Sequence, residues 1–464
     1  MTADDDVPAL SDTTGDAGAA AGAGAAAGGR NNARRPDDDA ANRSWHAMLA
    51  AFKVPAFTWY WSGQLLSGVG TWSQSIALAW LVLDLTHSAV DLGTVTMLQF
   101  LPILAFALFG GVIADRFPRR QLLVATQVAL TAEAVTLGLL VATHAVTLWE
   151  VGLIALAVGT TNALNNPAQQ AFVPELVGRD LVADAVALNS VQFNSARMLG
   201  GAVGGLAIAA WGISGALFLN AASFAPIVVV LVAIRPGHAA RHPTTERTSA
   251  LVELRQGLSY ALAAVPIRRV VVLFAVIGVF GFNWQVAVPL VARFVLHRQA
   301  TGFGDLMAAL GAGSLLAAVA VAHDQRATER RLVIGGVALG VTLVALGLSG
   351  SYGLSLAALV LAGVAGVVTS VTANTRLQLL TPDRLRGRVM GIYVLLMGGT
   401  TPVGSFLLGE LAGHFGTGSA LVVFGVATAG AVGLIGAARR HTARRSGDPD
   451  APVAPPDTAI GAGR

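Results

Sequence analysis

The chain has 464 residues, of which 54% are hydrophobic and only 12% are charged, and its mean hydropathy is +0.65. A soluble domain carries charge at about a quarter of its positions, so this composition indicates an integral membrane protein. The net charge of +4 reflects arginines in the loops between apolar segments, where the positive-inside rule accounts for them without nucleic-acid binding. There is no cysteine, which excludes disulfides and thiolate metal sites.

The two ends of the chain differ from its centre. Residues 1–50 contain an Ala/Gly tract and lack the basic start and apolar core of a signal peptide, so we expect a disordered cytoplasmic tail. Residues 441–464, rich in Pro, Gly and Asp, are interpreted in the same way. Residues 51–234 and 267–440 are expected to form two six-helix bundles. A cytoplasmic loop, residues 235–266, joins them, and its segment from Ala250 to Leu262 has the period of an amphipathic helix.

Twelve apolar segments are expected to cross the membrane as helices. A span needs about 20 apolar residues, and in lipid only helices and closed barrels satisfy the backbone. The segments are residues 56–84, 89–114, 119–143, 148–171, 183–210, 213–234, 267–295, 300–322, 331–349, 353–378, 387–413 and 417–438.

Arginines set the expected orientation. They cluster in alternate loops, around residues 116–120, 179, 235–269, 326–331 and 384–388, whereas the other loops hold only Arg293 and Arg298. Short basic loops stay in the cytoplasm, so both termini are predicted to be cytoplasmic.

An internal repeat supports two related halves. Four residues recur 208 positions later, at the end of an even-numbered helix in each half; a chance match is the alternative. The pairs are Asn166 and Asn374, Gln170 and Gln378, Pro174 and Pro382, and Glu175 and Asp383. Parallel repeats of this kind are a known plan of transporters.

These features resemble the major facilitator superfamily. The charged turn Gly111–Arg120 after the second helix, the twelve helices, the repeat and the long central loop carry the resemblance, which covers about residues 50–440. Further segments are similar to its drug and siderophore exporter branch, which includes the enterobactin exporter and macrolide-efflux proteins. They are residues 80–86, 99–102, 165–177, 187–189 and 194–197. The resemblance implies an all-α membrane fold of two pseudo-symmetric six-helix bundles.

Two positions and one segment depart from the superfamily pattern. Pro118 replaces a glycine of the charged turn, and Gly201 replaces the proline of the antiporter motif in the fifth helix, which weakens a motif-based argument for antiport. The counterpart of the turn in the second half, residues 323–331, is degenerate, which suggests an asymmetric gate.

The resemblance implies that the charged turn gates the cytoplasmic side. Asp115 can pair with neighbouring arginines or accept hydrogen bonds from the start of the eleventh helix when that side is shut. The alternative is that the arginines only obey the positive-inside rule. The expected gating residues are Gly111, Asp115, Arg116, Arg119, Arg120, Asn166, Gln170 and Asn374.

The fourth segment carries a polar stripe. Asn162, Asn165, Asn166, Gln169 and Gln170 have helical spacing and are predicted to share an inward face, because amides that face lipid are costly. We assign Asn162 to a substrate cavity and Asn166 and Gln170 to the inner gate. Hydrogen bonds that hold helices together are the alternative for each amide.

Arg197 lies about 14 residues into the fifth segment, on one face with Ser190 and Asn194. A charge at that depth costs about 2.5–3.5 kcal/mol on insertion scales, so it needs a partner or a wet cavity. We expect it to contact an anionic substrate group or to take part in coupling, and a structural pair with a carbonyl or an acid is the alternative.

A ring of sparse polar groups at mid-depth is expected to bind the substrate. Such groups among apolar and aromatic walls suit an amphipathic molecule better than a sugar. The expected binding residues are Gln64, Ser67, Thr71, Gln74, Asn162, Asn194, Arg197, Asn283, Gln285 and Ser370.

Two acids are candidates for proton coupling. Glu133 lies midway along the third segment, where a neutral, hydrogen-bonded or snorkelling glutamate is the alternative. Asp84 lies near the outer end of the first segment, where an outer gate or a helix-end contact is an equally good interpretation.

The sequence therefore predicts a secondary transporter in a bacterial plasma membrane, active as a monomer and without a cofactor. It would export an amphipathic siderophore or drug by alternating access, in exchange for protons. An importer or uniporter on the same fold is the alternative. ATP-binding and catalytic motifs such as GxxxxGK[ST], HExxH and GxSxG are absent from the sequence, which argues against an ATP-driven pump and an intramembrane enzyme. A structural or sensory role would not need Arg197 or the polar stripe.

Overall fold

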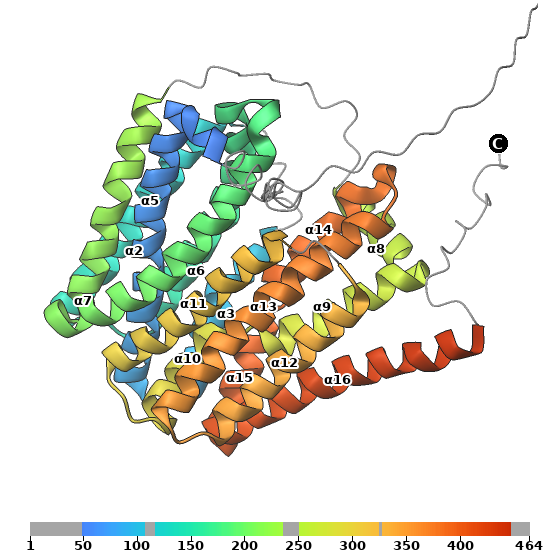
Figure 1. Ribbon diagram of the computed structural model, residues 1–464. Helices are drawn as coiled ribbons and strands as arrows, with labels where there is room; N and C mark the ends of the chain where they lie inside the picture. The colour runs from blue at the N-terminus through green and yellow to red at the C-terminus, as the bar shows by residue number, and fades with distance from the viewer. Residues whose placement is uncertain (1–48, 107–116, 235–249, 324–326, 447–464) are drawn as a thin grey trace, which may run out of the picture. The chain divides into compact units, whose positions relative to one another are not determined.

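The computed structural model describes residues 49–106, 117–234, 250–323 and 327–446, and within them all regular structure is helical (Figure 1). The N-terminal group of helices, α2 to α7, comprises residues before 235. Its elements are η1 (Leu49–Lys53), α2 (Pro55–Thr86), α3 (Ala89–Phe106), α5 (Arg119–Ala142), α6 (Leu148–Val177), η2 (Arg179–Leu181) and α7 (Val182–Ala233).

The C-terminal group, α9 to α16, follows the predicted surface helix, which is confirmed as α8 (Ala250–Ala263). Its elements are α9 (Val265–Gly281), α10 (Trp284–Leu290), the π-helical turn η3 (Val291–Val295), α11 (Ala300–His323), α12 (Glu329–Leu348), α13 (Tyr352–Leu380), α14 (Asp383–Gly399), α15 (Thr401–Phe415) and α16 (Thr417–Ser446).

Nine helical segments of the described chain are long and apolar enough to cross a membrane, which makes this a multi-pass membrane protein. One of them, α7, contains the expected fifth and sixth segments. Gly212 separates these with a φ of 71°, a left-handed conformation that a residue without Cβ adopts freely. The helix α6 is long enough to span but is not among the nine, and it carries the amide-rich stripe.

The expected seventh segment is interrupted. The helix α9 ends at Gly281, and α10 begins at Trp284 with Asn283 at its N-cap. Uniform hydropathy over residues 267–295 hides this break, because the Gly281-Phe-Asn sequence changes the backbone without adding charge. Broken helices at membrane depth are tolerated only where protein or a water-filled cavity surrounds them.

The two groups pack against one another mainly along two helix pairs. In the α3–α15 pair, a Cβ on Gly93 would lie 2.7 Å from the Ser405 carbonyl oxygen, so only glycine permits this approach. In the α7–α11 pair, a Cβ on Gly304 would lie 2.7 Å from the Gly201 carbonyl oxygen and 3.0 Å from the Gly205 Cα. Close backbone approach at small residues is how membrane helices gain packing contacts.

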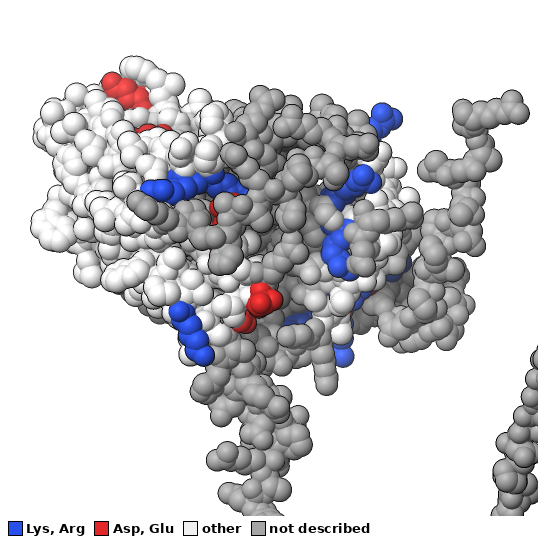
Figure 2. All heavy atoms as spheres, turned by 90° about the horizontal axis from the view of Figure 1, so that it is seen from above, with Lys and Arg blue, Asp and Glu red and all other residues white. Residues whose placement is uncertain are grey.

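The bundle has two ends, which we call the Asp84 end and the Arg119 end. At the Asp84 end α2 and α15 finish and α3 and α11 begin; at the Arg119 end α5, α12 and α14 begin. Figure 2 looks onto the Arg119 end, at the top of Figure 1, where basic side chains stand out. Exposed arginines on elements at this end are Arg255, Arg268, Arg330 and Arg386.

Candidate functional site

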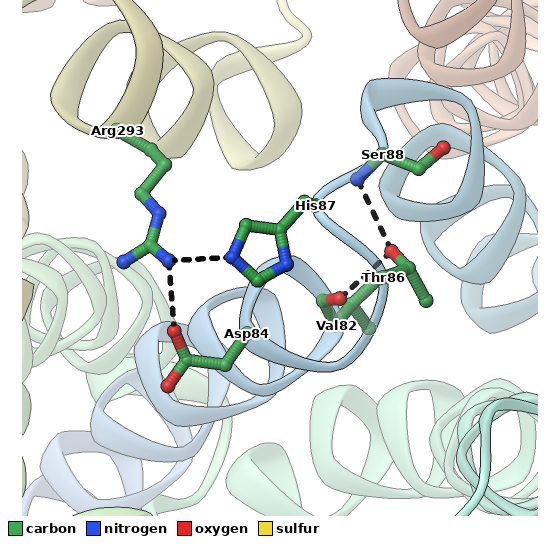
Figure 3. A network of polar contacts seen from close by, with 6 residues as sticks. All are labelled: Val82, Asp84, Thr86, His87, Ser88 and Arg293. Carbon is green, nitrogen blue, oxygen red and sulfur yellow. Dashed lines mark hydrogen bonds and ion pairs between the residues drawn. The ribbon is translucent and has the colours of Figure 1, made fainter.

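An ion pair joins the two groups at the Asp84 end. The Arg293 Nη2 lies 3.2 Å from the Asp84 Oδ1 and 3.4 Å from the His87 Nε2 (Figure 3). The Arg293 guanidinium also lies 5.1 Å from the centre of the Trp80 ring. His87 caps α2 with a left-handed φ of 53°, which turns the chain toward α3. Asp84, His87 and Trp80 belong to the N-terminal group and Arg293 to η3. This contact therefore holds the two groups together and favours the outer-gate interpretation of Asp84.

A second polar contact between the groups lies at mid-length, at Arg197 of α7. Its Nη2 donates to the Asn194 Oδ1 at 3.1 Å and to the Ser314 Oγ of α11, and its guanidinium lies 5.9 Å from the centre of the Trp72 ring. Its Nε is buried and has no hydrogen-bond partner. Between residues that the structure describes, all hydrogen bonds and ion pairs joining the groups lie here or at the Asp84 end.

Beyond Arg197 toward the Arg119 end, α7 presents an open face. Val186, Ser190 and Phe193 are exposed on it, and Asn194 is partly exposed. The ring of Phe193 meets the Trp72 ring edge-on, with 5.7 Å between the ring centres. The Arg197 guanidinium thus contacts Asn194, Ser314 and the Trp72 ring, and Trp72 in turn contacts Phe193.

Most of the predicted polar groups on α2 are engaged within the N-terminal group. The Gln74 Oε1 accepts from the Asn220 Nδ2 at 2.6 Å, and the Gln64 Nε2 donates to the Tyr60 hydroxyl at 3.0 Å. Ser67 is 3% exposed. Only Thr71 is exposed, and its hydroxyl donates to the Ser67 carbonyl oxygen. The structure therefore leaves Thr71 as the most accessible of this set.

The amide stripe on α6 divides between two environments, so the prediction of one shared inward face is wrong for Asn165. That side chain is 4% exposed, and its Oδ1 accepts from the Thr126 Oγ1 of α5 at 2.9 Å. Asn166 and Gln170 are exposed, and Asn162 is partly exposed. The spacing i, i+3, i+4 covers an arc of about 100°, wide enough for neighbouring amides to face different helices.

The predicted residues of the C-terminal group also differ in accessibility. Asn283 is 5% exposed at the α9–α10 break, where its Nδ2 donates to the Val279 carbonyl oxygen at 2.6 Å and its Oδ1 is buried without a partner. Gln285 and Ser370 are partly exposed, and the Ser370 hydroxyl donates to the Gly366 carbonyl oxygen. Asn374 accepts a hydrogen bond of 2.6 Å from the exposed Gln378.

Two of the predicted gating arginines bind within the N-terminal group. The Arg119 Nη1 lies 2.7 Å from the Glu175 Oε1 and also donates to the Ala171 carbonyl oxygen. Arg120 donates to the carbonyl oxygens of Leu231 and Val232 at the end of α7, where cations are favourable. The predictions for Gly111, Asp115 and Arg116 lie outside the described residues.

Glu133 lies between α5 and α6. Its Oε1 accepts from the Thr161 Oγ1 at 2.7 Å, whereas its Oε2 is buried without a partner. A carboxyl group in which one oxygen accepts a hydrogen bond and the other has no partner can bind a proton on the second oxygen.

Ser314 and Thr161 were not predicted, because single hydroxyls within apolar helices carry no spacing signal. In the sequence, Arg293 serves only to set the orientation of the helices. It is one of two arginines in the expected outer loops and lies on the same side of the membrane as Asp84, and this shared side is the signal that could predict their ion pair.

The amino-acid sequence matches known transporters. The profile of the transmembrane secretion effector family, a family of major facilitator transporters, matches residues 46–455. The chain is 24% identical over 375 residues to the staphyloferrin A transporter of Staphylococcus aureus, covering 80% of this chain and 93% of that protein. It is 26% identical over 359 residues to the multidrug efflux pump Tap of Mycolicibacterium fortuitum, covering 75% and 87%. With the enterobactin exporter EntS of Escherichia coli it shares 25% identity over 396 residues, covering 83% and 94%.

Solved structures show the same fold. The nucleoside transporter NupG superposes with a TM-score of 0.68 at 11% identity, covering 82% of this chain and 98% of that one. A bacterial homologue of the human lysosomal transporter Spinster, in an inward-facing unoccupied conformation, superposes with a TM-score of 0.62 at 14% identity, covering 82% and 94%. The chain belongs to the transmembrane secretion effector family of the major facilitator superfamily.

Proposed function

We propose that this transporter exports an amphipathic small molecule from the cytoplasm by alternating access, in exchange for protons. The observation that carries the proposal is the pair of contacts between the two groups. Asp84 and Arg293 join them at one end, and Arg197 and Ser314 join them at mid-length. A binding site at mid-length, with a contact at one end that can break, is the arrangement that rocking of two halves requires.

The orientation in the membrane is part of the proposal. The exposed arginines at the Arg119 end support a cytoplasmic position for that end, and hence for both termini. Counting α7 as two spans at Gly212 and treating α9–η3 and α14–α15 as one span each gives the twelve spans that we propose. On this topology Asp84 and Arg293 form the outer gate, and the described conformation is closed to the outside.

Export of siderophore-like or drug-like molecules is supported by the relatives, two of which are named as an enterobactin exporter and a multidrug efflux pump. The accessible groups near Arg197 also support an amphipathic substrate, because Phe193 and Trp72 supply aromatic surface next to few polar atoms. Coupling to protons rests on Glu133, with its buried unpartnered oxygen.

Import is the second candidate, and the observation that favours it is the structural match to the nucleoside transporter NupG. The same site and gates would serve uptake if the gradient drove the cycle in reverse. Direction therefore has to be measured.

The test is transport into inside-out membrane vesicles, in which export appears as uptake. Vesicles with and without the protein are energised to an acidic interior and supplied with a panel of siderophores and fluorescent dyes. We expect protein-dependent uptake of at least one compound, and we expect a protonophore to abolish it. Uptake insensitive to the protonophore would remove proton coupling, and absence of protein-dependent uptake across the panel would refute export.

A further inference from the structure

We propose that the exported substrate carries a negative charge, and that Arg197 is the cation that holds it. The inference rests on the proposed transport function and deepens it, because it names the charge of the molecule that the mid-length site accepts. The site comprises Arg197 and Asn194 of α7, Ser314 of α11 and the aromatic pair Trp72 and Phe193.

The hydrogen-bond partners that the structure gives Arg197 include no carboxylate. Arg119, Arg293 and Arg376 each lie within 3.5 Å of a carboxylate oxygen, of Glu175, Asp84 and Glu329 respectively. Arg197 instead has two uncharged oxygen acceptors on one nitrogen. Removing an unpaired cation from water is costly, so a ligand anion would supply the missing counter-charge.

The donors that remain on Arg197 suit an oxyanion. Its Nη2 is used by Asn194 and Ser314, while its Nε is buried and has no partner. A guanidinium presents five N–H donors in a planar fork that matches the oxygens of a carboxylate or sulfonate. The nearby Trp72 and Phe193 rings could pack against the apolar body of the same molecule.

An organic cation would meet the opposite situation. Three carboxylates of the described helices already have partners elsewhere: Glu133 accepts from Thr161, Asp305 accepts from Tyr352, and Asp84 pairs with Arg293. Close to Arg197 the described chain offers a cation no carboxylate, only uncharged oxygens and aromatic faces beside the positive charge of the guanidinium. The site should therefore discriminate against cationic amphiphiles.

The alternative is that Arg197 merely ties α7 to α11 through Ser314. Substitution of Ser314 by alanine separates the two roles, because it removes the hydrogen bond between α7 and α11 and leaves the Arg197 Nη2 with one acceptor fewer. For an anion site, affinity for an anion should then rise by about twofold, whereas for a structural tie it should fall as far as in Arg197→Gln.

The experiment compares three fluorescent probes on the purified full-length protein. They are 8-anilinonaphthalene-1-sulfonate, its uncharged counterpart N-phenyl-1-naphthylamine, and the cation ethidium. We expect the anion to bind about tenfold more tightly than its neutral counterpart, and Arg197→Gln to remove most of that difference, because a charge-assisted hydrogen bond is worth about this much. Arg197→Lys should restore part of it.

Arg298→Gln is the matched control, since it removes the same charge from an arginine that lies over the Tyr352 ring at the Asp84 end. It should leave the ratio of anion to neutral affinity unchanged. Each variant is accepted only if it elutes as a single species and unfolds at a temperature close to that of the parent. Equal binding of the anion and its neutral counterpart, or preference for ethidium, would overturn the inference, as would a ratio unaffected by Arg197→Gln. Vesicle uptake of cationic dyes would then leave the export proposal standing, whereas absence of all uptake would refute export itself.

Discussion

The two carboxyl oxygens of Glu133 lie in different settings, one hydrogen-bonded and one without a partner. Its Oε1 accepts from Thr161, which fixes the carboxyl between α5 and α6, and its buried Oε2 is left without a partner. A proton on this group would remove a costly buried charge. The contact with Thr161 therefore positions the carboxyl without neutralising it.

The prediction for Glu133 uses the isosteric amide. Glu133→Gln can still accept from Thr161 but cannot carry a proton, so stimulation of transport by a pH gradient should be lost while movement down a substrate gradient continues. Vesicle uptake with and without an imposed gradient measures both quantities. Asp305→Asn, at a carboxylate that accepts from Tyr352, is the control. Gradient-driven uptake that survives in Glu133→Gln would exclude this residue as the coupling site.

The sequence identified which residues were chemically unusual but not all of their partners. Arg197 and Asp84 could be selected because charges within apolar segments are rare. Their partners could not, because Ser314 is 117 positions away from Arg197 and Arg293 is 209 positions away from Asp84. Gln74 and Asn165 had the same polar signature as the cavity residues but are buried against Asn220 and Thr126.

The packing of α7 against α11 depends on small residues that let the two backbones come into contact. Gly201, Gly205 and Gly304 form the α7–α11 contact, and the only atoms that a Cβ on Gly304 would meet within 3.2 Å belong to the backbone of α7. Backbone atoms cannot rotate away as a flexible side chain can. A larger residue must therefore separate the two helices.

Gly304→Val should weaken this contact by about 1–3 kcal/mol, the usual cost of overpacking. Thermal unfolding of the purified protein checks it, and the unfolding temperature should fall relative to Gly353→Val, because a Cβ at Gly353 meets nothing within 4 Å. Equal unfolding temperatures for the two variants would show that the α7–α11 contact is looser than described.

Helix positions were largely predictable because apolar length is a strong signal in membrane proteins. The surface helix at Ala250–Ala263 agreed with its amphipathic period. The break between α9 and α10 was missed, since a Gly-Phe-Asn step in an apolar segment changes hydropathy little. Division of α6 into buried and exposed amides also escaped prediction, because it depends on which helices lie beside it.

At the scale of the whole molecule, the outer gate determines which state is populated. Asp84 and Arg293 are 44% and 22% exposed, so their pairing contributes at most about 1 kcal/mol, which corresponds to about a fivefold change in a two-state equilibrium. A change of that size is enough to be seen in populations and small enough for a transport cycle to reverse. Asp84→Asn should therefore favour opening at this end.

Paired spin labels measure this opening directly, and the absence of native cysteines means that each introduced pair is unique. Exposed positions are available at both ends: Thr143→Cys with Gly350→Cys at the Asp84 end, and Asp180→Cys with Leu379→Cys at the Arg119 end. With Asp84→Asn, alternating access predicts that longer distances gain population at the Asp84 end while shorter distances gain population at the Arg119 end. Unchanged distances at both ends, or lengthening at both ends together, would contradict it.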